Sequence, residues 1–388
     1  MHSCSGRRPR IMASSLSLPQ NIITDILSRL PVKSLTRFKS VSKNWGHLTS
    51  TPALVATHLS RSSPDPSLLI RRYNTQSGGG FGIWLITNPT RNYGSLLLKI
   101  PLQEPLPRFP KIVGSVDGLV CLDVSPCYGS EFVLWNPGTK QFKGLFPLIA
   151  SSKNNPIWLV FLGFGFDSFN NDYKLVRIVS FRRNDAFPFV RVEVYSWRDG
   201  VWKEIQESFD FAVLCGGQDG VVVNGSLNWV GIGLERFADR KVVVSFDMGR
   251  EVFKTIPLPA VTRLANVKVM SYMGSLAIAV YPLVFAANGD NMNRFEFWVL
   301  SDCDDGSKQW TIMFVIENFS KSLIPIGTWI DREVVIKNIG GRAREDYPSF
   351  FLYDPVDKGT KRLPVDCVDF YIEGYSYVQS LVSVNGRS

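Results

Sequence analysis

The residue types that acid–base and metal chemistry require are scarce in this chain. Its only histidines are His2, His47 and His58, so residues 61–388 contain no imidazole. This excludes a Ser-His-Asp or Cys-His mechanism, and a His-ligated metal, from that part of the chain. The sequence also lacks the motifs of α/β-hydrolases, zinc proteases and P-loop nucleotide-binding proteins. We therefore expect no catalytic residue, no metal site and no cofactor.

A cluster of carboxylates and a glycine-rich stretch are weaker candidates for a metal or phosphate site. Asp302, Asp304 and Asp305 cluster, but they fall in a turn between two strand-like runs and lack the spacing of an EF-hand calcium loop. The glycine-rich residues 163–167 lead into strand-like sequence, so they lack the helix N-terminus that usually binds phosphate. Paired carboxylates of the glycosidase kind remain an open alternative.

The cysteine pattern indicates free thiols. No two of the six cysteines form a C-x-x-C pair, and the closest two are six residues apart, which is not a common zinc spacing. The N-terminus lacks the apolar segment of a secretory signal. A reducing compartment is therefore expected, either the cytoplasm or the nucleus, in which the cysteines act as small apolar residues. They are Cys4, Cys121, Cys127, Cys215, Cys303 and Cys367.

The composition is that of a folded protein without a membrane span. Of the 388 residues, 45% are hydrophobic and 12% are aromatic, which is too many for a largely disordered chain. No apolar run approaches the ~20 residues of a transmembrane helix, so no membrane partner is expected. Arg7, Arg8 and Arg10 resemble a nuclear import signal, but such clusters are equally typical of disordered tails. Translation could begin at Met1 or at Met12, and residues 1–15 are predicted to be a disordered basic tail.

The net charge of +9 is concentrated at one end of the chain. Residues 1–60 contain eight Lys and Arg against the single acid Asp25, a local charge of +7, while residues 61–388 carry the other +2. A nucleic-acid-binding protein would need a basic face on its large domain, so nucleic acid is not an expected partner. A basic N-terminal module favours an acidic protein partner, although a solvated helix face would carry the same charge.

Residues 18–45 carry the only strong helical pattern. A wide apolar stripe of an amphipathic helix is formed by Ile22, Ile23, Ile26, Leu27 and Leu30. Pro31 ends this helix, a second pattern surrounds Phe38, Ser42 can cap a third helix, and Thr51-Pro52 can open a fourth. The stripe is broader than the core of a module of ~45 residues needs. Part of it should stay exposed for a partner, or else pack on the following domain.

The same stretch strongly resembles the F-box in the form common among plant F-box proteins. The matching residues, from position 18, are L-P-x-x-I-x-x-D-I-L-x-R-L-P-V-K-S-L-x-R-F-K-x-V-S-K-x-W, with Ile22 and Asp25 in place of the usual Leu and Glu. The resemblance implies that residues 16–60 form three to four short helices that dock on the Skp-type adaptor of a cullin-RING ubiquitin ligase. It also implies which residues engage the adaptor or support that face: Leu18, Pro19, Ile22, Ile26, Leu27, Leu30, Pro31, Leu35, Val41 and Trp45.

Beyond a short linker the sequence reads as β-structure with an internal repeat. Runs rich in Val, Ile, Phe, Trp and Tyr alternate with turn residues. A strand–turn–strand phrase recurs every ~50–60 residues, with turns centred near residues 89, 138, 199, 248, 304 and 356. A second kind of hairpin is marked by Asp117-Gly118, Asn224-Gly225 and Met273-Gly274. Two hairpins, and so four strands, per repeat are typical of a β-propeller blade.

The predicted fold class is therefore a small all-α module followed by a large all-β domain, a β-propeller in residues 61–388. Six turn centres predict six blades, with five or seven as the alternative if one unit is misread. Residues 378–384 are predicted to be a terminal strand that completes the first blade and closes the ring. The repeat phrases and the closing Y-V-Q-S-L-V are similar to the F-box-associated domain, a kelch-like propeller domain of plant proteins, although a full kelch signature is missing.

The propeller offers candidates for target binding without defining a site. Trp158 and Trp329 are interpreted as loop residues that could line a binding surface. The basic pairs Arg182-Arg183 and Arg342-Arg344 could read an acidic target, or could simply be solvated. Most other tryptophans fall at repeat-related positions and are expected to pack between blades.

The F-box and the propeller together imply a non-catalytic substrate-recognition subunit of an SCF-type ubiquitin ligase. The F-box would dock on the adaptor while the propeller recruits a target protein for ubiquitination. The alternative is a carbohydrate-binding propeller or a propeller hydrolase with a degenerate F-box, which should show a central pocket lined by carboxylates. The sequence does not identify the target, nor whether its recognition requires a modification or a small molecule.

Overall fold

A computed structural model provides the structure of the chain and describes most of its residues. These are residues 19–64, 66–74, 80–87, 95–98, 110–125, 129–152, 156–181, 189–206, 209, 211–213, 219–233, 240–282, 294–303, 306–317, 322–329, 332–339, 349–363 and 373–385.

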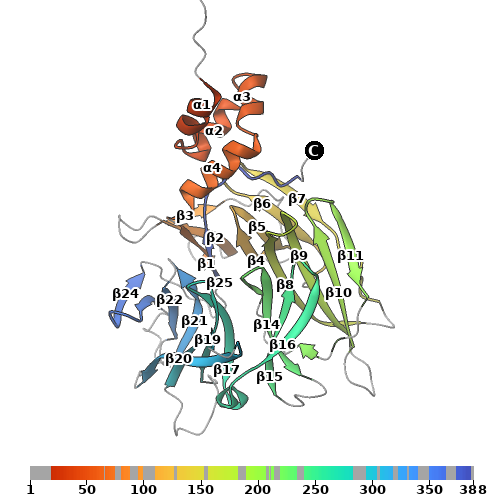
Figure 1. Ribbon diagram of the computed structural model, residues 1–388, viewed down its shortest axis with the longest axis vertical. Helices are drawn as coiled ribbons and strands as arrows, with labels where there is room; N and C mark the ends of the chain where they lie inside the picture. The colour runs from red at the N-terminus through yellow and green to blue at the C-terminus, as the bar shows by residue number, and fades with distance from the viewer. Residues whose placement is uncertain are drawn as a thin grey trace, which may run out of the picture.

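Four short helices come first and form a compact module at one end of the molecule (Figure 1). They are α1 (Gln20–Leu27), α2 (Val32–Phe38), α3 (Lys43–Leu48) and α4 (Pro52–Ser62). Helix α1 ends at Leu27, before the Pro31 that was predicted to stop it, and Pro31 occupies the N-cap of α2. The predicted cap of α3 is confirmed, because the Trp45 amide donates to Ser42 Oγ at 3.3 Å. None of the described helices is long and apolar enough to cross a membrane.

The described strands form six antiparallel sheets, which are the blades of a propeller. Blade I contains β1 (Ser67–Asn74), β2 (Gly80–Ile86), β3 (Ser95–Leu98) and β25 (Glu373–Tyr377). Blade II contains β4 (Lys111–Val116), β5 (Leu119–Asp123), β6 (Phe132–Asn136) and β7 (Gln141–Leu145). Blade III contains β8 (Ile157–Asp167), β9 (Asp172–Phe181), β10 (Phe189–Ser196) and β11 (Val201–Ile205).

Blade IV contains β12 (Phe211–Val213), β13 (Val221–Val223), β14 (Ser226–Gly233), β15 (Lys241–Asp247) and β16 (Val252–Pro257). Blade V contains β17 (Asn266–Tyr272), β18 (Ser275–Tyr281), β19 (Arg294–Asp302) and β20 (Lys308–Glu317), preceded by a 3₁₀ turn, η2 (Ala260–Leu264). Blade VI contains β21 (Ser322–Trp329), β22 (Glu333–Ile339), β23 (Ser349–Asp354) and β24 (Gly359–Leu363). In blade IV, β12 and β13 pair with successive parts of β14 and share one strand position.

The six blades close into a ring. Their inner strands contact one another in the order β25, β4, β8, β13, β17, β21 and back to β25. The predicted propeller and its six blades are confirmed, and so is the closure of blade I by a strand from the end of the chain. Closure removes the open edges that a strand of this position would otherwise expose.

The closing strand itself was placed wrongly by the sequence pattern. It is β25 (Glu373–Tyr377), whereas residues 378–384 form no strand. The reason lies in the partner strand, because Tyr377 pairs with Ser67, the first residue of β1. No residue of β1 remains to pair with Val378, so the chain leaves the sheet at that point.

The two kinds of predicted hairpin are confirmed where the structure describes them. At Asp117-Gly118 the backbone φ angles are 51° and 79°, and Asn224-Gly225 and Met273-Gly274 repeat this geometry. Two successive positive φ angles are those of the tight hairpin turn that matches strand twist. Turns near residues 138, 199, 248 and 356 join the two outer strands of blades II, III, IV and VI. Because strands in a blade alternate in direction, both kinds of turn lie at the same end of each blade, here called the turn face.

The cores lie between neighbouring blades, and the tryptophans contribute to them as expected. Trp229 is buried with Phe246 and Val176 between blades III and IV. Trp135 is buried in the cluster that joins blades I and II, and Trp197 in the cluster of blades II and III. Each buried large apolar side chain stabilises the fold by roughly 1.5–3 kcal/mol relative to its exposed state.

The helical module stands on the turn face, over blades I and II (Figure 1). Helix α4 ends at Ser62 and β1 begins at Ser67, so the connection is short. A Cβ atom added at Gly138, in the turn between β6 and β7, would lie 3.1 Å from Val32 Cγ1 of α2. The module is therefore packed directly on the propeller.

Candidate functional site

The residues predicted to engage a partner divide into an exposed set and a buried set. Exposed large apolar side chains are Ile22 (44%), Ile26 (48%), Val41 (69%) and Trp45 (37%). Pro19 and Pro31 are also exposed, and Leu30 is half-buried. Leu27 and Leu35 are buried in the core of the helical module, and Leu18 lies outside the described residues.

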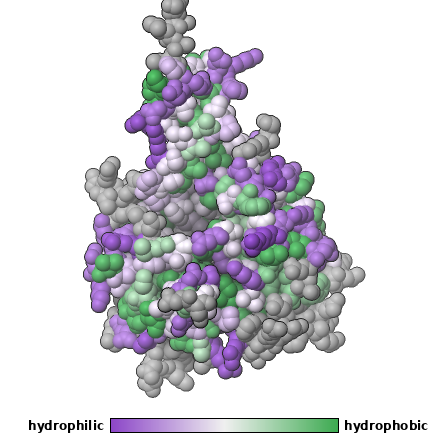
Figure 2. All heavy atoms as spheres, in the orientation of Figure 1, coloured by the Kyte–Doolittle hydropathy of each residue, from purple (hydrophilic) through white to green (hydrophobic). Residues whose placement is uncertain are grey.

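The exposed set comes from the first three helices and the turns between them. Ile22 and Ile26 are one helical turn apart on α1, and Val41 and Trp45 flank the start of α3. Trp45 is held by Phe38, whose ring centroid lies 5.5 Å away. Figure 2 shows hydrophobic residues among strongly hydrophilic ones at this end of the molecule. Apolar side chains left uncovered by the fold and surrounded by charge are typical of a protein-binding surface.

An ion-pair cluster connects the first and last helices of the module. Asp25 on α1 pairs with Arg29, at 3.2 Å, and with Arg61 on α4. The Arg61 guanidinium also donates to the Asp25 carbonyl at 3.0 Å and to Ser28 Oγ at 2.6 Å. The hydrogen bonds from Arg61 and then from Arg29 lower the pKa of the Asp25 carboxyl. Arg61 thus fixes α4 against the C-terminal end of α1.

The core of the module is completed by a residue from the other end of the chain. Leu381 is buried against the helix residues Leu27, Val32, Leu35 and Leu54. It belongs to residues 378–385, here called the C-terminal segment, which leaves β25 and runs beside α4 (Figure 1). Sequence reasoning missed this contact because it assigned the segment to the propeller sheet. The apolar residues of this segment indicated that it is buried, but not that one of them packs against the helices.

A cavity of about 350 Å³ lies where the helical module meets the C-terminal segment. Its lining includes Leu30, Arg61, His58 and Gln379. His58 is buried, and its Nε2 lies 3.1 Å from the Leu30 carbonyl. Burial lowers the pKa of His58, opposed by that contact. His58 therefore joins α4 to the turn that follows α1.

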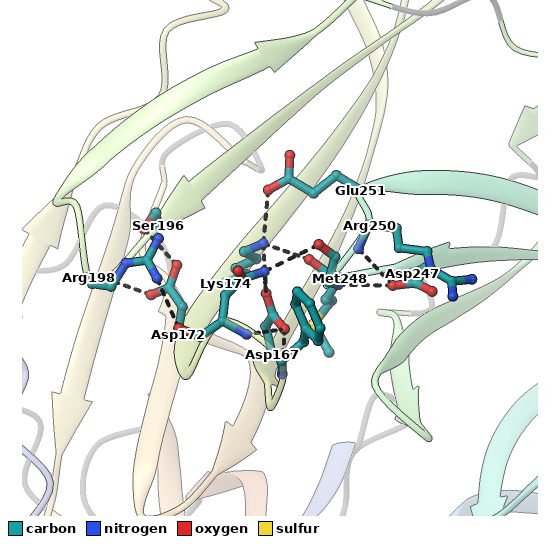
Figure 3. Close-up of polar contacts among 12 residues, drawn as sticks. Asp167, Asp172, Lys174, Ser196, Arg198, Asp247, Met248, Arg250 and Glu251 are labelled. Carbon is teal, nitrogen blue, oxygen red and sulfur yellow. Dashed lines mark hydrogen bonds and ion pairs between the residues drawn. The ribbon is translucent and has the colours of Figure 1, made fainter.

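A second polar site lies on the turn face between blades III and IV, centred on Lys174 (Figure 3). The buried Nζ atom contacts Met248 O at 2.6 Å, Glu251 Oε1 at 2.8 Å and Asp167 Oδ2 at 3.0 Å. Burial opposes its charge, but Glu251 and Asp167 outweigh that effect and raise the pKa of Lys174. Lys174 therefore ties blade III to the turn of blade IV.

The cavity next to Lys174 has a volume of about 370 Å³ and a polar lining. At one side the carboxylate of Asp172 accepts from Ser196 Oγ at 2.6 Å and from the Arg198 amide at 2.7 Å. At the other side Lys203 pairs with Glu251. Since these charges are compensated from within the protein, we interpret this site as a connection between blades.

Lys174→Met is expected to lower the free energy of unfolding by about 1–3 kcal/mol, because it leaves buried acceptors unpaired. Lys203→Met is the matched control, since Lys203 pairs with the same Glu251 but is exposed, and it should cost less than about 1 kcal/mol. Equilibrium denaturation of the two variants provides the measurement. Equal losses would contradict the role assigned to Lys174.

The centre of the ring contains a paired carboxylate. Lys111 of blade II lies 2.9 Å from Asp219, which precedes β13 of blade IV. Tyr375 of blade I donates to the Ile112 carbonyl at 3.0 Å. These contacts cross between blades I, II and IV and hold the carboxylate beside a cation.

The tryptophan, arginine and aspartate candidates of the propeller differ in burial and position. Trp158 is exposed (49%) at the start of β8, whereas Trp329 is buried (1%) at the end of β21. Both are strand residues, so their assignment to loops was wrong, and Trp329 cannot line a binding surface. The arginine pairs at 182–183 and 342–344, and Asp304 and Asp305, lie outside the described residues. Within the described ranges, no group of three or more His, Cys, Asp or Glu residues could hold a metal ion.

Comparison with known protein families gives two matches. The model of the F-box domain matches residues 15–55, and the model described as "F-box associated beta propeller domain" matches residues 85–336. The first match covers the exposed apolar surface of α1 to α3, and the second runs from β2 of blade I to β22 of blade VI.

Two curated relatives from Arabidopsis thaliana illustrate the similarity. The F-box/kelch-repeat protein At3g23880 is 30% identical over 263 residues, which are 64% of this chain and 68% of the relative. F-box protein CPR1 is 26% identical over 322 residues, 78% of this chain and 73% of the relative. Among solved structures, the periplasmic gluconolactonase PpgL of Pseudomonas aeruginosa has 11% identity and a TM-score of 0.41, with 76% of this chain and 81% of that one covered. That likeness is too weak to carry a functional argument.

Proposed function

Because the chain belongs to the family of F-box proteins with an F-box associated beta propeller domain, we propose that it is a substrate-recognition subunit of an SCF-type ubiquitin ligase. Its F-box docks on a Skp-type adaptor, and through it on the cullin-RING ligase, while the propeller recruits a target protein. The observation that carries this proposal is the set of apolar side chains that the F-box leaves exposed: Ile22, Ile26, Val41 and Trp45.

The adaptor surface proposed here has two layers. The exposed side chains on α1 and α3 contact the adaptor, together with Leu18 and with the helix N-caps Pro19 and Pro31. The buried Leu27 and Leu35, with the half-buried Leu30, hold those helices in position from behind. The F-box in this proposal comprises residues 16–60, preceded by a basic tail, 1–15, and followed by the propeller, 61–388.

The proposed role is non-catalytic. A receptor of this kind accelerates ubiquitin transfer by holding target lysines near the conjugating enzyme, so the rate gain comes from proximity. Neither nucleic acid nor a membrane is a proposed partner, and the proposed compartment is the cytoplasm or the nucleus. The target remains a protein of unidentified sequence.

The ends of the blades opposite the turn face are the proposed target side. The F-box occupies the turn face, where strands are joined by tight turns. At the opposite ends, successive strands are separated by longer stretches, as between β18, which ends at Tyr281, and β19, which begins at Arg294. Longer interstrand stretches on a rigid ring supply the sequence variation that target selection needs.

The proposal predicts that the double variant Ile22→Asp/Ile26→Asp binds the adaptor at least ~100-fold more weakly than the wild type, because two apolar anchors become charged. Both side chains are exposed, so the unfolding transition of the full chain should change little. Binding is measured by calorimetry with purified Skp-type adaptor and the full-length chain.

The matched control is Val201→Asp/Val252→Asp, which places two charges at similarly exposed positions on the outer strands of blades III and IV. This control should bind the adaptor like the wild type. Absence of binding by the wild type, or equal binding by the two double variants, would refute the proposed docking surface.

A further inference from the structure

The F-box core draws one of its buried residues from the end of the chain. Its buried members within the helices are Leu27, Val32, Leu35 and Leu54, and the fifth is Leu381. More than 300 residues separate Leu381 from α4 in the sequence. A small helical module has few apolar residues to bury, so each buried leucine is a large share of its stability.

The C-terminal segment is held to the propeller by its backbone. The buried side-chain amide of Asn136 donates to the carbonyls of Ser380 at 3.2 Å and Val382 at 2.7 Å. The Trp197 indole donates to the Ser383 carbonyl at 3.1 Å. These donors come from blades II and III. The segment is therefore fixed before and after Leu381.

Side chains of the segment enter two different cores. Leu381 packs into the F-box, while Val382 and Val384 are buried in the cluster between blades II and III. The half-buried Val55 of α4 packs against both clusters. The segment is thus shared between the helices and the ring.

The conformation of the segment also depends on a glycine. Ser380 Oγ donates to the Asp117 carbonyl in the turn between β4 and β5. The next residue, Gly118, has a φ of 79°, and a Cβ atom there would clash with the Ser380 side chain. Gly118 therefore supplies both the turn geometry and the room for the segment.

Leu381 lies behind the proposed adaptor surface. Ile22 and Ile26 are exposed on α1, and the same helix buries Leu27 in the cluster that contains Leu381. Loss of Leu381 would leave a cavity under α1 and α2, and would remove the support that sets the position of the exposed isoleucines.

We propose that Leu381 is a positioning residue of the F-box, and that the C-terminal segment completes the F-box fold so that adaptor docking requires the end of the chain. The inference rests on the proposed adaptor binding for its functional consequence. Its structural half, the dependence of α1 to α4 on Leu381, can be measured without the adaptor.

The first test compares Leu381→Asp with the volume-conserving Leu381→Met in the full chain. Leu381→Asp is expected to weaken adaptor binding at least ~30-fold, whereas Leu381→Met should stay within about threefold of the wild type.

Hydrogen exchange measures how far the fold of α1 to α4 depends on Leu381, without the adaptor. Amides of residues 19–62 should exchange at least ~10-fold faster in Leu381→Asp, while amides of β8 to β11 keep their protection. Asn385→Asp, at an exposed position of the same segment, is the charge control and should match the wild type.

The second test removes and returns the segment. A chain ending at Tyr377 keeps β25 but lacks Leu381, and should not bind the adaptor. Adding a synthetic peptide of residues 378–388 at millimolar concentration should restore binding, because the peptide replaces a tethered segment at a comparable effective concentration. The same peptide carrying Leu381→Asp should restore less than a tenth of the adaptor binding that the wild-type peptide restores.

Two outcomes would overturn the inference. One is adaptor binding within threefold of the wild type by the chain ending at Tyr377. Another is faster exchange of propeller amides together with F-box amides in Leu381→Asp, which would assign Leu381 to the whole fold. Failure of the wild type to bind the adaptor would refute the proposed function alone, because the exchange data would still test the role of Leu381.

Discussion

Glu193→Gln should lower the free energy of unfolding by about 3–5 kcal/mol, because it leaves the buried Arg177 guanidinium without its counterion. The two residues face each other on β9 and β10, and Arg177 Nη1 lies 2.5 Å from Glu193 Oε1, with both side chains buried. The other carboxylate oxygen accepts from the amides of Leu148 and Ile149 at 3.1 and 3.0 Å. Burial lowers the pKa of Arg177, and the Glu193 carboxylate opposes that effect.

Two further variants separate the charge effect from packing. The double variant Arg177→Met/Glu193→Leu should recover most of the lost stability, because it removes both charges at similar volume. Glu204→Gln is the matched control, since Glu204 forms a partly exposed pair with Arg191 on the neighbouring strands β10 and β11, and it should cost less than about 1 kcal/mol. Urea denaturation is the measurement. A loss below 1 kcal/mol for Glu193→Gln would show that the buried pair is dispensable.

Trp329→Ala should cost about 3–5 kcal/mol, the loss expected when a large buried aromatic side chain leaves a cavity. Trp329 is buried with Ile70 and Phe350 in the cluster that joins blades VI and I. Its indole donates to the Pro66 carbonyl at 3.1 Å, directly before β1. The variant therefore weakens the interface at which the first and last blades meet.

The comparison with Trp158 makes this prediction specific. Trp158 is half exposed on β8, so Trp158→Ala should cost less than about 1 kcal/mol. Trp329→Phe keeps most of the apolar surface and loses only the indole donor, so its cost should fall between the two alanine variants. If both alanine variants shift the denaturation midpoint equally, Trp329 does not hold the blades together.

Local patterns predicted most of the propeller because turn chemistry is local. The Asp117-Gly118 and Asn224-Gly225 pairs need positive φ angles, and only a few residue types accept them. The recurrence of a second strand–turn–strand phrase, with six turn centres, predicted six blades before any long-range contact was known, with five or seven as the alternative. The F-box helices were equally predictable, since Pro31 and Ser42 mark helix boundaries by their own chemistry.

The errors arose where long-range contacts override local pattern. Trp329 follows Pro325 and Gly327, which favour a loop, yet β21 accommodates them through a register shift in its pairing with β22. The apolar residues at 378–384 resemble a strand, but β1 starts too late to pair with them. The stripe on α1 predicted an apolar face but could not separate exposed Ile26 from buried Leu27. That division depends on which side of α1 packs against the other helices and the C-terminal segment.

The position of Leu381 has a consequence for synthesis of the protein. The F-box is synthesised before the propeller, and Leu381, which completes its core, is made more than 300 residues after α4. At about 5–20 residues per second, the helices wait on the order of 15–60 s for it. A chain that stops before Leu381 would present an incomplete F-box, so adaptor capture would select chains in which the propeller has been made. A ligase assembled this way would be protected from truncated receptors that occupy the adaptor without a closed propeller.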